Sequence, residues 1–91
     1  MNKQEAIIEL QKLQRTTACA DDVDSVGLDS DIEPVERLAK QLGIYSGEVK
    51  KTIQVIYDRL VFNHRGYRLG ITWVEVYDMF NAMEAEIEAM P

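Results

Sequence analysis

The last fifth of the chain spaces its apolar residues alternately three and four positions apart. The positions that define this seam are Trp73, Val76, Phe80, Met83, Ile87 and Met90. An average step of 3.5 residues places them along one narrow stripe of an α-helix. Thr72 is suited to cap this helix, and Glu75 three residues later completes a capping box, which predicts a long helix over residues 72–89. The fold must therefore cover a narrow apolar seam on a long C-terminal helix.

Similar periodicity predicts three earlier helices. The first covers residues 3–16 and ends near two consecutive threonines. An acidic linker over residues 20–31, expected to be exposed, leads to a short second helix over 33–42. We expect Ser30 or Asp31 to cap that helix, and Gly43 to end it in the left-handed conformation. The third helix starts near Ser46 and runs to about residue 60.

The period changes from helical to alternating after residue 60. The alternating apolar residues are Leu60, Phe62, Tyr67, Leu69 and Ile71. They surround the sequence Asn63-His64-Arg65-Gly66, which is polar and contains a turn-forming glycine. The pattern predicts a short β-hairpin over residues 60–71 with a basic tip.

Composition limits the chain to one small domain without an obvious catalytic centre. Ninety-one residues are too few for two independent cores, and an apolar content of 46% is that of an ordinary globular domain. One cysteine and one histidine cannot build a zinc site of the usual type. The serines lack a nucleophile elbow and the glycines form no phosphate loop. We therefore expect no enzymatic activity, no metal and no cofactor.

The segment from residue 35 to residue 60 resembles the helix-turn-helix of DNA-binding proteins. Ala39 stands where the two helices approach each other, and Gly43 opens the turn. Ile44 and Val49 occupy the apolar positions that fix the angle between the helices. With the hairpin that follows, the order of elements is similar to that of the winged-helix branch. The expected fold class is therefore a mainly α domain with a helix-turn-helix, a short β-hairpin and a long C-terminal helix.

The resemblance implies a DNA-binding function. The helix that starts near Ser46 would be the recognition helix, and the hairpin would contact the adjacent backbone or minor groove. The residues expected to contact double-stranded DNA are Lys50, Lys51, Gln54, Arg65 and Arg68. The implied role is that of a small transcriptional regulator that acts by occupying its site.

Charge is distributed unevenly along the chain, and this distribution is compatible with two different functions. Residues 35–70 carry seven basic and three acidic side chains, a net charge of +4, while the rest of the chain carries a net charge of −10. A basic binding surface on an otherwise acidic domain would suit DNA binding. The alternative is an acidic helical interaction module, an adaptor or a DNA mimic, that binds a basic protein partner.

The narrow seam of the last helix favours a homodimer. Two such helices packed together would bury the seam and present two recognition helices to a two-fold related site. The expected dimer interface consists of Trp73, Val76, Phe80, Met83 and Ile87. Cys19 has no partner within the chain for a disulfide, and no apolar run is long enough for a membrane span, so a cytoplasmic location is expected.

Overall fold

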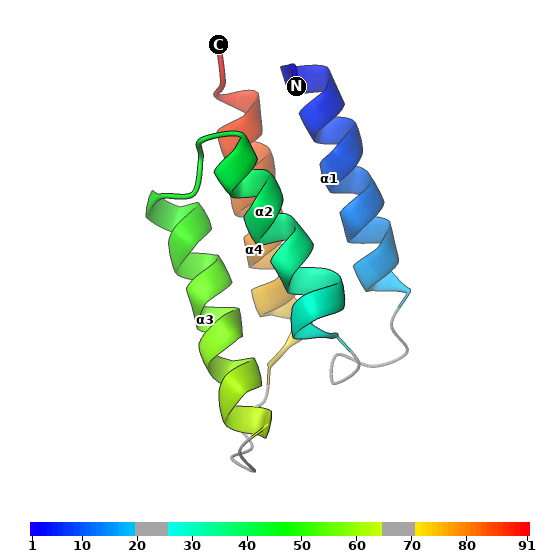
Figure 1. The fold of residues 1–91 in the computed structure, drawn as a ribbon, viewed down its shortest axis with the longest axis vertical. Coiled ribbons are helices and arrows are strands. Elements are labelled where there is room, and N and C mark those ends of the chain that lie inside the picture. Colours follow the sequence, from blue (N-terminus) through cyan, green and yellow to red (C-terminus); the bar gives the residue numbers. More distant parts are fainter. Residues whose placement is uncertain (20–25, 65–70) are drawn as a thin grey trace.

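The computed structural model describes residues 1–19, 26–64 and 71–91, and within them the chain forms four α-helices. They are α1 (Lys3–Ala18), α2 (Glu33–Gln41), α3 (Gly47–His64) and α4 (Trp73–Glu88), with a π-helical turn, η2 (Leu28–Ile32), directly before α2. Successive helices run in opposite directions, and the two termini lie at the same end (Figure 1). The arrangement is an up-down-up-down four-helix bundle. All four predicted helices are present.

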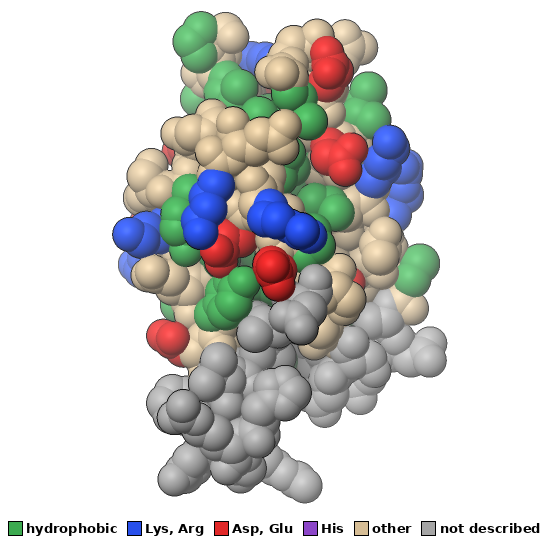
Figure 2. Space-filling model, in the orientation of Figure 1, with side chains coloured by type: hydrophobic (Ala, Val, Ile, Leu, Met, Phe, Trp, Pro, Cys, Tyr) green, Lys and Arg blue, Asp and Glu red, His purple; other side chains and the backbone are tan. Residues whose placement is uncertain are grey.

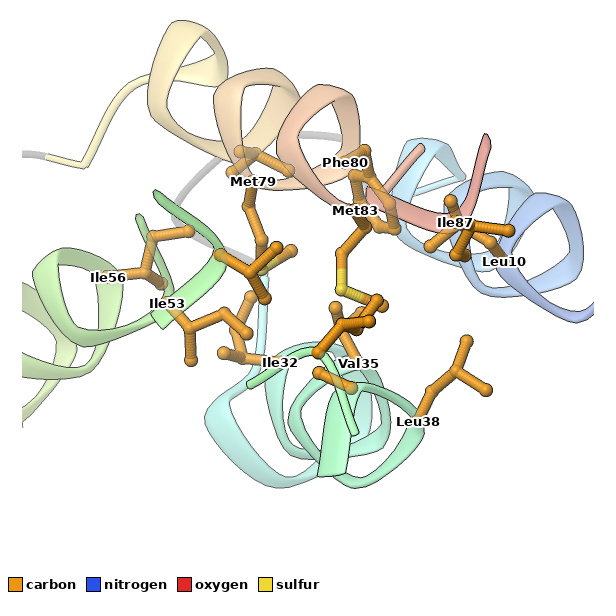
Figure 3. Close-up of a cluster of buried hydrophobic side chains, with 14 of the residues drawn as sticks. Leu10, Ile32, Val35, Leu38, Ile53, Ile56, Met79, Phe80, Met83 and Ile87 are labelled. Carbon is orange, nitrogen blue, oxygen red and sulfur yellow. The ribbon is translucent and has the colours of Figure 1, made fainter. Parts of the chain in front are cut away.

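Side chains from all four helices and η2 form one apolar core (Figure 3). The largest fully buried apolar side chains are Phe80, Ile32, Ile53, Ile56, Met79, Met83, Ile87, Val35, Val49 and Val76. Met79 and Met83 of α4 point toward α2 and α3, and Ile87 lies beside Leu10 of α1 (Figure 3). The seam of α4 thus packs into the core formed together with the other helices, and the neighbours of α4 in the bundle are α3 and α1.

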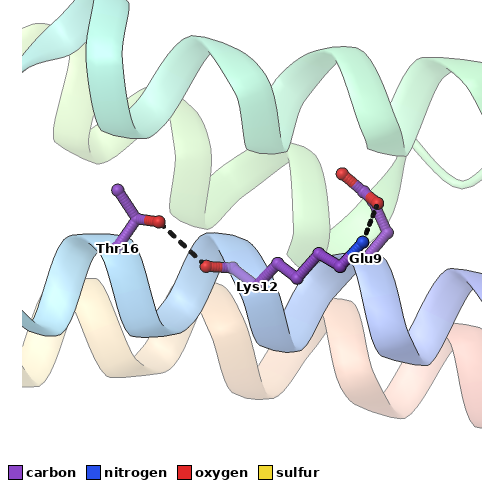
Figure 4. A network of polar contacts seen from close by, with 3 residues as sticks. All are labelled: Glu9, Lys12 and Thr16. Atoms are coloured by element: carbon purple, nitrogen blue, oxygen red, sulfur yellow. Dashed lines mark hydrogen bonds and ion pairs between the residues drawn. The ribbon is translucent and has the colours of Figure 1, made fainter.

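Helix α1 starts as predicted but extends two residues further. The Asn2 side chain caps it by accepting a hydrogen bond from the backbone N–H of Glu5 at 2.8 Å. At the other end, the Thr16 hydroxyl donates to the carbonyl oxygen of Lys12 at 3.0 Å, one turn back (Figure 4). Lys12 also lies 3.9 Å from the Glu9 carboxylate. The threonine hydroxyls bond within the helix, so they do not end it.

Asp31 does not cap α2, contrary to expectation. Its Oδ2 accepts hydrogen bonds from the backbone N–H of Gly27 at 2.8 Å and from the Ser30 hydroxyl at 3.1 Å. Its Oδ1 lies 3.3 Å from the hydroxyl of Thr17, which is buried at the end of α1. The N-cap of α2 is instead Ile32, without a side-chain hydrogen bond. The hydrogen bonds of Asp31 therefore link the start of η2 to the end of α1.

The expected exposed linker is in part a core segment. Its last six residues, 26–31, lie within the described chain, and residues 20–25 lie outside it. Val26 is buried in the apolar core, although aspartates dominate the sequence around it. An apolar side chain in an acidic segment can still enter the core when η2 folds back against α2 and α3.

The connection between α2 and α3 has the geometry predicted for Gly43. The φ angle of Gly43 is +73°, and its N–H donates to the carbonyl oxygen of Lys40 at 3.1 Å. The N–H of Ile44 donates to the carbonyl oxygen of Ala39 at 2.9 Å. These two bonds form a Schellman motif, which satisfies carbonyl groups at the end of α2. Gly47, the first residue of α3, also has a positive φ angle, +54°.

The predicted β-hairpin, and with it the winged-helix architecture, is wrong. Helix α3 continues to His64 through the residues expected to form the first strand, and the described residues contain no strand. Residues 65–70 lie outside the described chain. Extending an existing helix adds one hydrogen bond per residue, whereas a lone two-stranded hairpin is marginally stable in water. The alternation of Leu60 and Phe62 is therefore not evidence for a strand.

Candidate interaction surfaces

Three of the predicted DNA-contacting residues lie together on the outer side of α3. Lys50, Lys51 and Gln54 are all exposed, and Lys50 and Gln54 are one helical turn apart. Neither lysine forms an ion pair with another residue in the part of the chain that the structure describes. The other two predicted contacts, Arg65 and Arg68, lie outside the described residues. The structure therefore groups three of the five predicted residues on one exposed surface.

Two lysines from different helices converge on one aromatic ring, a feature that our sequence reasoning missed. The Nζ atoms of Lys40 in α2 and Lys50 in α3 lie 5.0 Å and 5.9 Å from the centroid of the Tyr45 ring. Both distances are within the range of cation–π attraction. The two lysines stand five residues before and five residues after Tyr45. This equal spacing predicts that both lysines lie near the ring only if the chain is known to reverse direction at Tyr45.

Glu36 reduces the positive charge of this region. Its Oε1 lies 2.8 Å from Lys40 Nζ, and this hydrogen-bonded ion pair raises the pKa of Lys40 above its ordinary value. Burial, followed by the nearby charge and hydrogen bond of Glu36, raises the pKa of Tyr57 to about 12. Glu36 thus connects α2 to α3. On the face shown in Figure 2, acidic and basic side chains lie next to each other, so this side of the bundle is mixed in charge.

Four of the five residues expected at a dimer interface are buried inside the chain's own core. Val76, Phe80, Met83 and Ile87 have at most 2% of their surface exposed. Trp73 is partly buried and stacks on Tyr77, with 6.0 Å between the ring centroids. The seam is covered by the other helices of the same chain. A second copy could pack on these four side chains only if the bundle opened.

The outer side of α4 is acidic. The helix contains five acidic residues and no basic one. Tyr77, Asn81, Glu84 and Glu88 follow one another at i, i+4, i+7 and i+11, and all four are exposed. That spacing aligns them along one side of the helix. We call these four residues the acidic stripe.

A shallow groove of about 220 Å³ lies between α3 and α4. Its lining residues are Glu48, Lys51, Thr52, Val55, Glu75 and Asp78. Arg59 of α3 and Glu75 of α4 form an ion pair of 2.6 Å beside it. Val55 in the lining is 37% exposed, and Val74, at the start of α4 and outside the lining, is 67% exposed. We call this feature the α3–α4 groove.

The described residues contain no group of three or more histidine, cysteine or acidic side chains placed to hold a metal ion. None of their helices combines the length and apolar character that crossing a bilayer requires. No protein family, curated protein or solved structure matches this chain. A functional proposal therefore depends on the chemistry of the surfaces described above.

Proposed function

We propose that this protein is a helical interaction module that binds a basic segment of a partner protein through the acidic stripe of α4. The observation that carries the proposal is the charge of α4, with five carboxylates and no basic residue over sixteen positions. Within the described chain, only Glu75 of these five forms an ion pair. The other four carboxylates are exposed, and two of them, Glu84 and Glu88, belong to the acidic stripe.

The position of the carboxylates on α4 supports an intermolecular role. Glu84, Glu86 and Glu88 lie toward the C-terminal end of the helix, and the last turn contains no basic residue. The helix dipole favours cations at that end, typically by about 0.3–1 kcal/mol for each charge. These carboxylates therefore lower the intrinsic stability of α4. A sequence selected for stability alone would favour lysine or arginine at these positions. Binding of a cationic partner would explain why acidic residues occupy them instead.

The stripe also defines the chemistry of the partner. Tyr77, a residue that is 47% exposed, offers an aromatic surface at one end, and Glu84 and Glu88 offer negative charge at the other. An amphipathic helix with an apolar residue followed at i+7 and i+11 by lysine or arginine would match that order. The neutral Asn81 between them can donate and accept hydrogen bonds.

The test uses a synthetic helical peptide with one leucine and lysines at i+7 and i+11. Binding is followed by chemical shifts of backbone amides in the protein at physiological ionic strength. We expect shifts along Tyr77, Asn81, Glu84 and Glu88, and loss of binding in a Glu84→Lys, Glu88→Lys variant. The control variant Glu5→Lys, Glu9→Lys makes the same change in net charge on α1 and should retain binding. Equal loss in both variants would show nonspecific attraction to an acidic protein and would refute the proposal.

DNA binding through α3 is the second candidate, and a specific observation favours it. Lys50, Lys51 and Gln54 share an exposed surface, and the ring of Tyr45 brings Lys40 close to Lys50. Lysines can contact phosphates or guanine, and glutamine can read an adenine edge. The overall charge of −6 and the Glu36–Lys40 ion pair oppose this function, because phosphate binding depends on unneutralised cations. It therefore ranks below the interaction module.

The two candidates are separated by fluorescence anisotropy with random-sequence duplex DNA over a salt titration. If α3 binds DNA, Lys50→Glu combined with Lys51→Glu should abolish binding. Lys3→Glu combined with Lys12→Glu, which makes the same charge change on α1, should weaken it only slightly. Binding that is absent at low salt, or equally reduced in both variants, would exclude α3 as a DNA-reading helix.

A further inference from the structure

Asp78 of α4 is an exposed carboxylate that lies outside the acidic stripe. It follows Glu75 by three residues, and both residues line the α3–α4 groove. Glu75 is neutralised by its ion pair with Arg59. Asp78 forms no ion pair within the part of the chain that the structure describes. The groove therefore contains one negative charge from α4 that no described cation balances.

The Arg59–Glu75 ion pair shows which residues of the two helices lie at the same height. Because α3 and α4 run in opposite directions (Figure 1), moving three residues forward from Glu75 corresponds to moving three residues back from Arg59. Asp78 therefore lies at about the height of residue 56, next to Val55. Val55 lines the same groove and is 37% exposed. The two walls of the groove thus carry an exposed apolar residue and an unpaired carboxylate at almost the same height.

This combination matches the side chain of an arginine. Arginine and lysine both have a hydrocarbon stem that covers apolar surface and a cationic head that stays in water or pairs with an anion. Arginine is the better match, because its planar guanidinium can donate two parallel hydrogen bonds to one carboxylate. The groove, at about 220 Å³, is smaller than the cavities of roughly 300–1,000 Å³ that enclose small-molecule ligands. Its size therefore suits one side chain presented by a larger molecule.

We propose that the α3–α4 groove binds a single arginine side chain from a segment of a partner protein. The stem of the arginine lies on Val55, and its guanidinium pairs with Asp78. The contact removes apolar surface of Val55 from water and neutralises a charge that the described chain leaves unpaired. Charge complementarity thus selects a cationic occupant for this part of the groove.

Lys51 limits what stands beside the bound arginine. It lines the groove four residues before Val55, which places it about 6 Å further along α3. Lys51 forms no ion pair with another described residue, so its charge repels a second cation in the partner. Glu48 lies about 10 Å from the height of Val55, too far to share the same guanidinium. We therefore expect the partner segment to carry one arginine next to a neutral or acidic residue, not a run of basic residues.

The groove and the acidic stripe lie on different sides of α4. Glu75 faces α3 through its ion pair with Arg59, and Tyr77, the first residue of the stripe, follows two residues later. Two residues correspond to about 200° of rotation around a helix. Arginine binding in the groove is therefore a second interaction, beyond the one proposed for the stripe, and each can be tested without the other.

The test compares two capped peptides of alanine and glutamine, one with a single central arginine and one with citrulline in its place. Citrulline has the same length and nearly the same shape as arginine but no charge. Backbone amide chemical shifts of the protein report the binding of each peptide. We expect the arginine peptide to shift the amides of Val55, Asp78 and their neighbours. It should bind about threefold or more tightly than the citrulline peptide, because only arginine forms the ion pair.

Two pairs of variants with matched charge changes locate the contact. Asp78→Asn should weaken binding of the arginine peptide by about threefold or more, and Glu84→Gln, in the acidic stripe, should leave it unchanged. Lys51→Gln should strengthen binding by about twofold, because it removes a repulsive charge from the groove. Lys50→Gln, on α3 but outside the groove lining, should change it less. Circular dichroism verifies that each variant folds.

Equal binding of the two peptides, or equal effects of Asp78→Asn and Glu84→Gln, would overturn the proposal. Amide shifts confined to the acidic stripe would also overturn arginine binding in the groove, while they would still support a basic partner for the stripe. Amide shifts confined to the groove support the arginine site whether or not the stripe binds its own peptide.

Discussion

The guanidinium of Arg59 in α3 lies 2.6 Å from Oε1 of Glu75 in α4, and the other oxygen of the same carboxylate accepts a hydrogen bond from the backbone N–H of Thr72. One side chain therefore joins two helices and also caps the second one. The side chains of Arg59 and Glu75 are 38% and 19% exposed, so the ion pair is only partly screened by water. This contact fixes where α4 begins relative to the end of α3.

Glu75→Ala should lower the free energy of unfolding by about 1–2 kcal/mol, because it removes both the cap and the ion pair. Glu75→Gln should cost roughly 0.5 kcal/mol, since glutamine can still accept the hydrogen bond from Thr72 but carries no charge. Urea unfolding followed by circular dichroism measures both values. A double-mutant cycle with Arg59→Gln isolates the ion pair. A coupling energy of zero would show that the contact between Arg59 and Glu75 contributes nothing to stability.

The sequence predicts the helices well because each one carries its own apolar period. The turn was equally predictable, since the positive φ angle of Gly43 follows from the glycine itself. The hairpin was wrong because Leu60 and Phe62 alternate over too few residues to distinguish a strand from the end of a long helix. The expected cap by Asp31 is wrong because an acidic side chain near a helix start has several amide groups within reach, and Asp31 accepts from the N–H of Gly27 instead.

The candidate surfaces were less predictable than the fold. The exposure of Lys50, Lys51 and Gln54 follows from the period of α3, and the structure agrees. The cluster around Tyr45 and the α3–α4 groove depend on which helices are neighbours, and a single helical pattern does not contain that information. The seam of α4 shows the same limit. Its period identifies an apolar stripe, but not whether the covering side chains come from the same chain.

Met83 provides a direct test of where the seam packs. The side chain is fully buried and points toward Val35 of α2. Met83→Ala should therefore lower the free energy of unfolding by about 2–4 kcal/mol through lost apolar contacts and the resulting cavity. Because the contacts lie within one chain, this loss should be the same at low and high protein concentration. A loss that changed with protein concentration would place Met83 at an interface between copies instead.

Gly43 has a φ angle of +73°, which an L-residue with a β-carbon adopts at a cost. Apart from Gly43 itself and its two chain neighbours, no residue has a heavy atom within 4 Å of the position that a β-carbon would occupy there, so the cost of substitution arises from the local backbone conformation. We expect Gly43→Ala to destabilise the protein by about 1–2 kcal/mol, and Gly43→Asn to cost less because asparagine tolerates the left-handed region better. Thermal unfolding of the two variants measures the difference. Equal stability of both variants with the wild type would contradict a left-handed Gly43.

Tyr57 and Lys40 predict a loss of stability at high pH. The pKa of Tyr57 is raised from 10.0 to about 12, chiefly by burial and then by Glu36, so the folded protein retains a proton that the unfolded chain releases. Its contribution is fully present below pH 10 and is lost as the pH rises toward 12. The raised pKa of Lys40 acts in the same direction, because the Glu36–Lys40 ion pair disappears when Lys40 loses its proton.

Tyr57→Phe separates these two contributions. The variant should lose stability less steeply than the wild type between pH 10 and pH 12, while Lys40 continues to titrate. The difference in tyrosinate absorbance between wild type and this variant gives the titration of Tyr57 directly. Glu36→Gln should shift that titration to lower pH, because it removes the negative charge that opposes ionisation of the phenol. A Tyr57 titration centred at pH 10 in the wild type would show that neither burial nor Glu36 holds the proton.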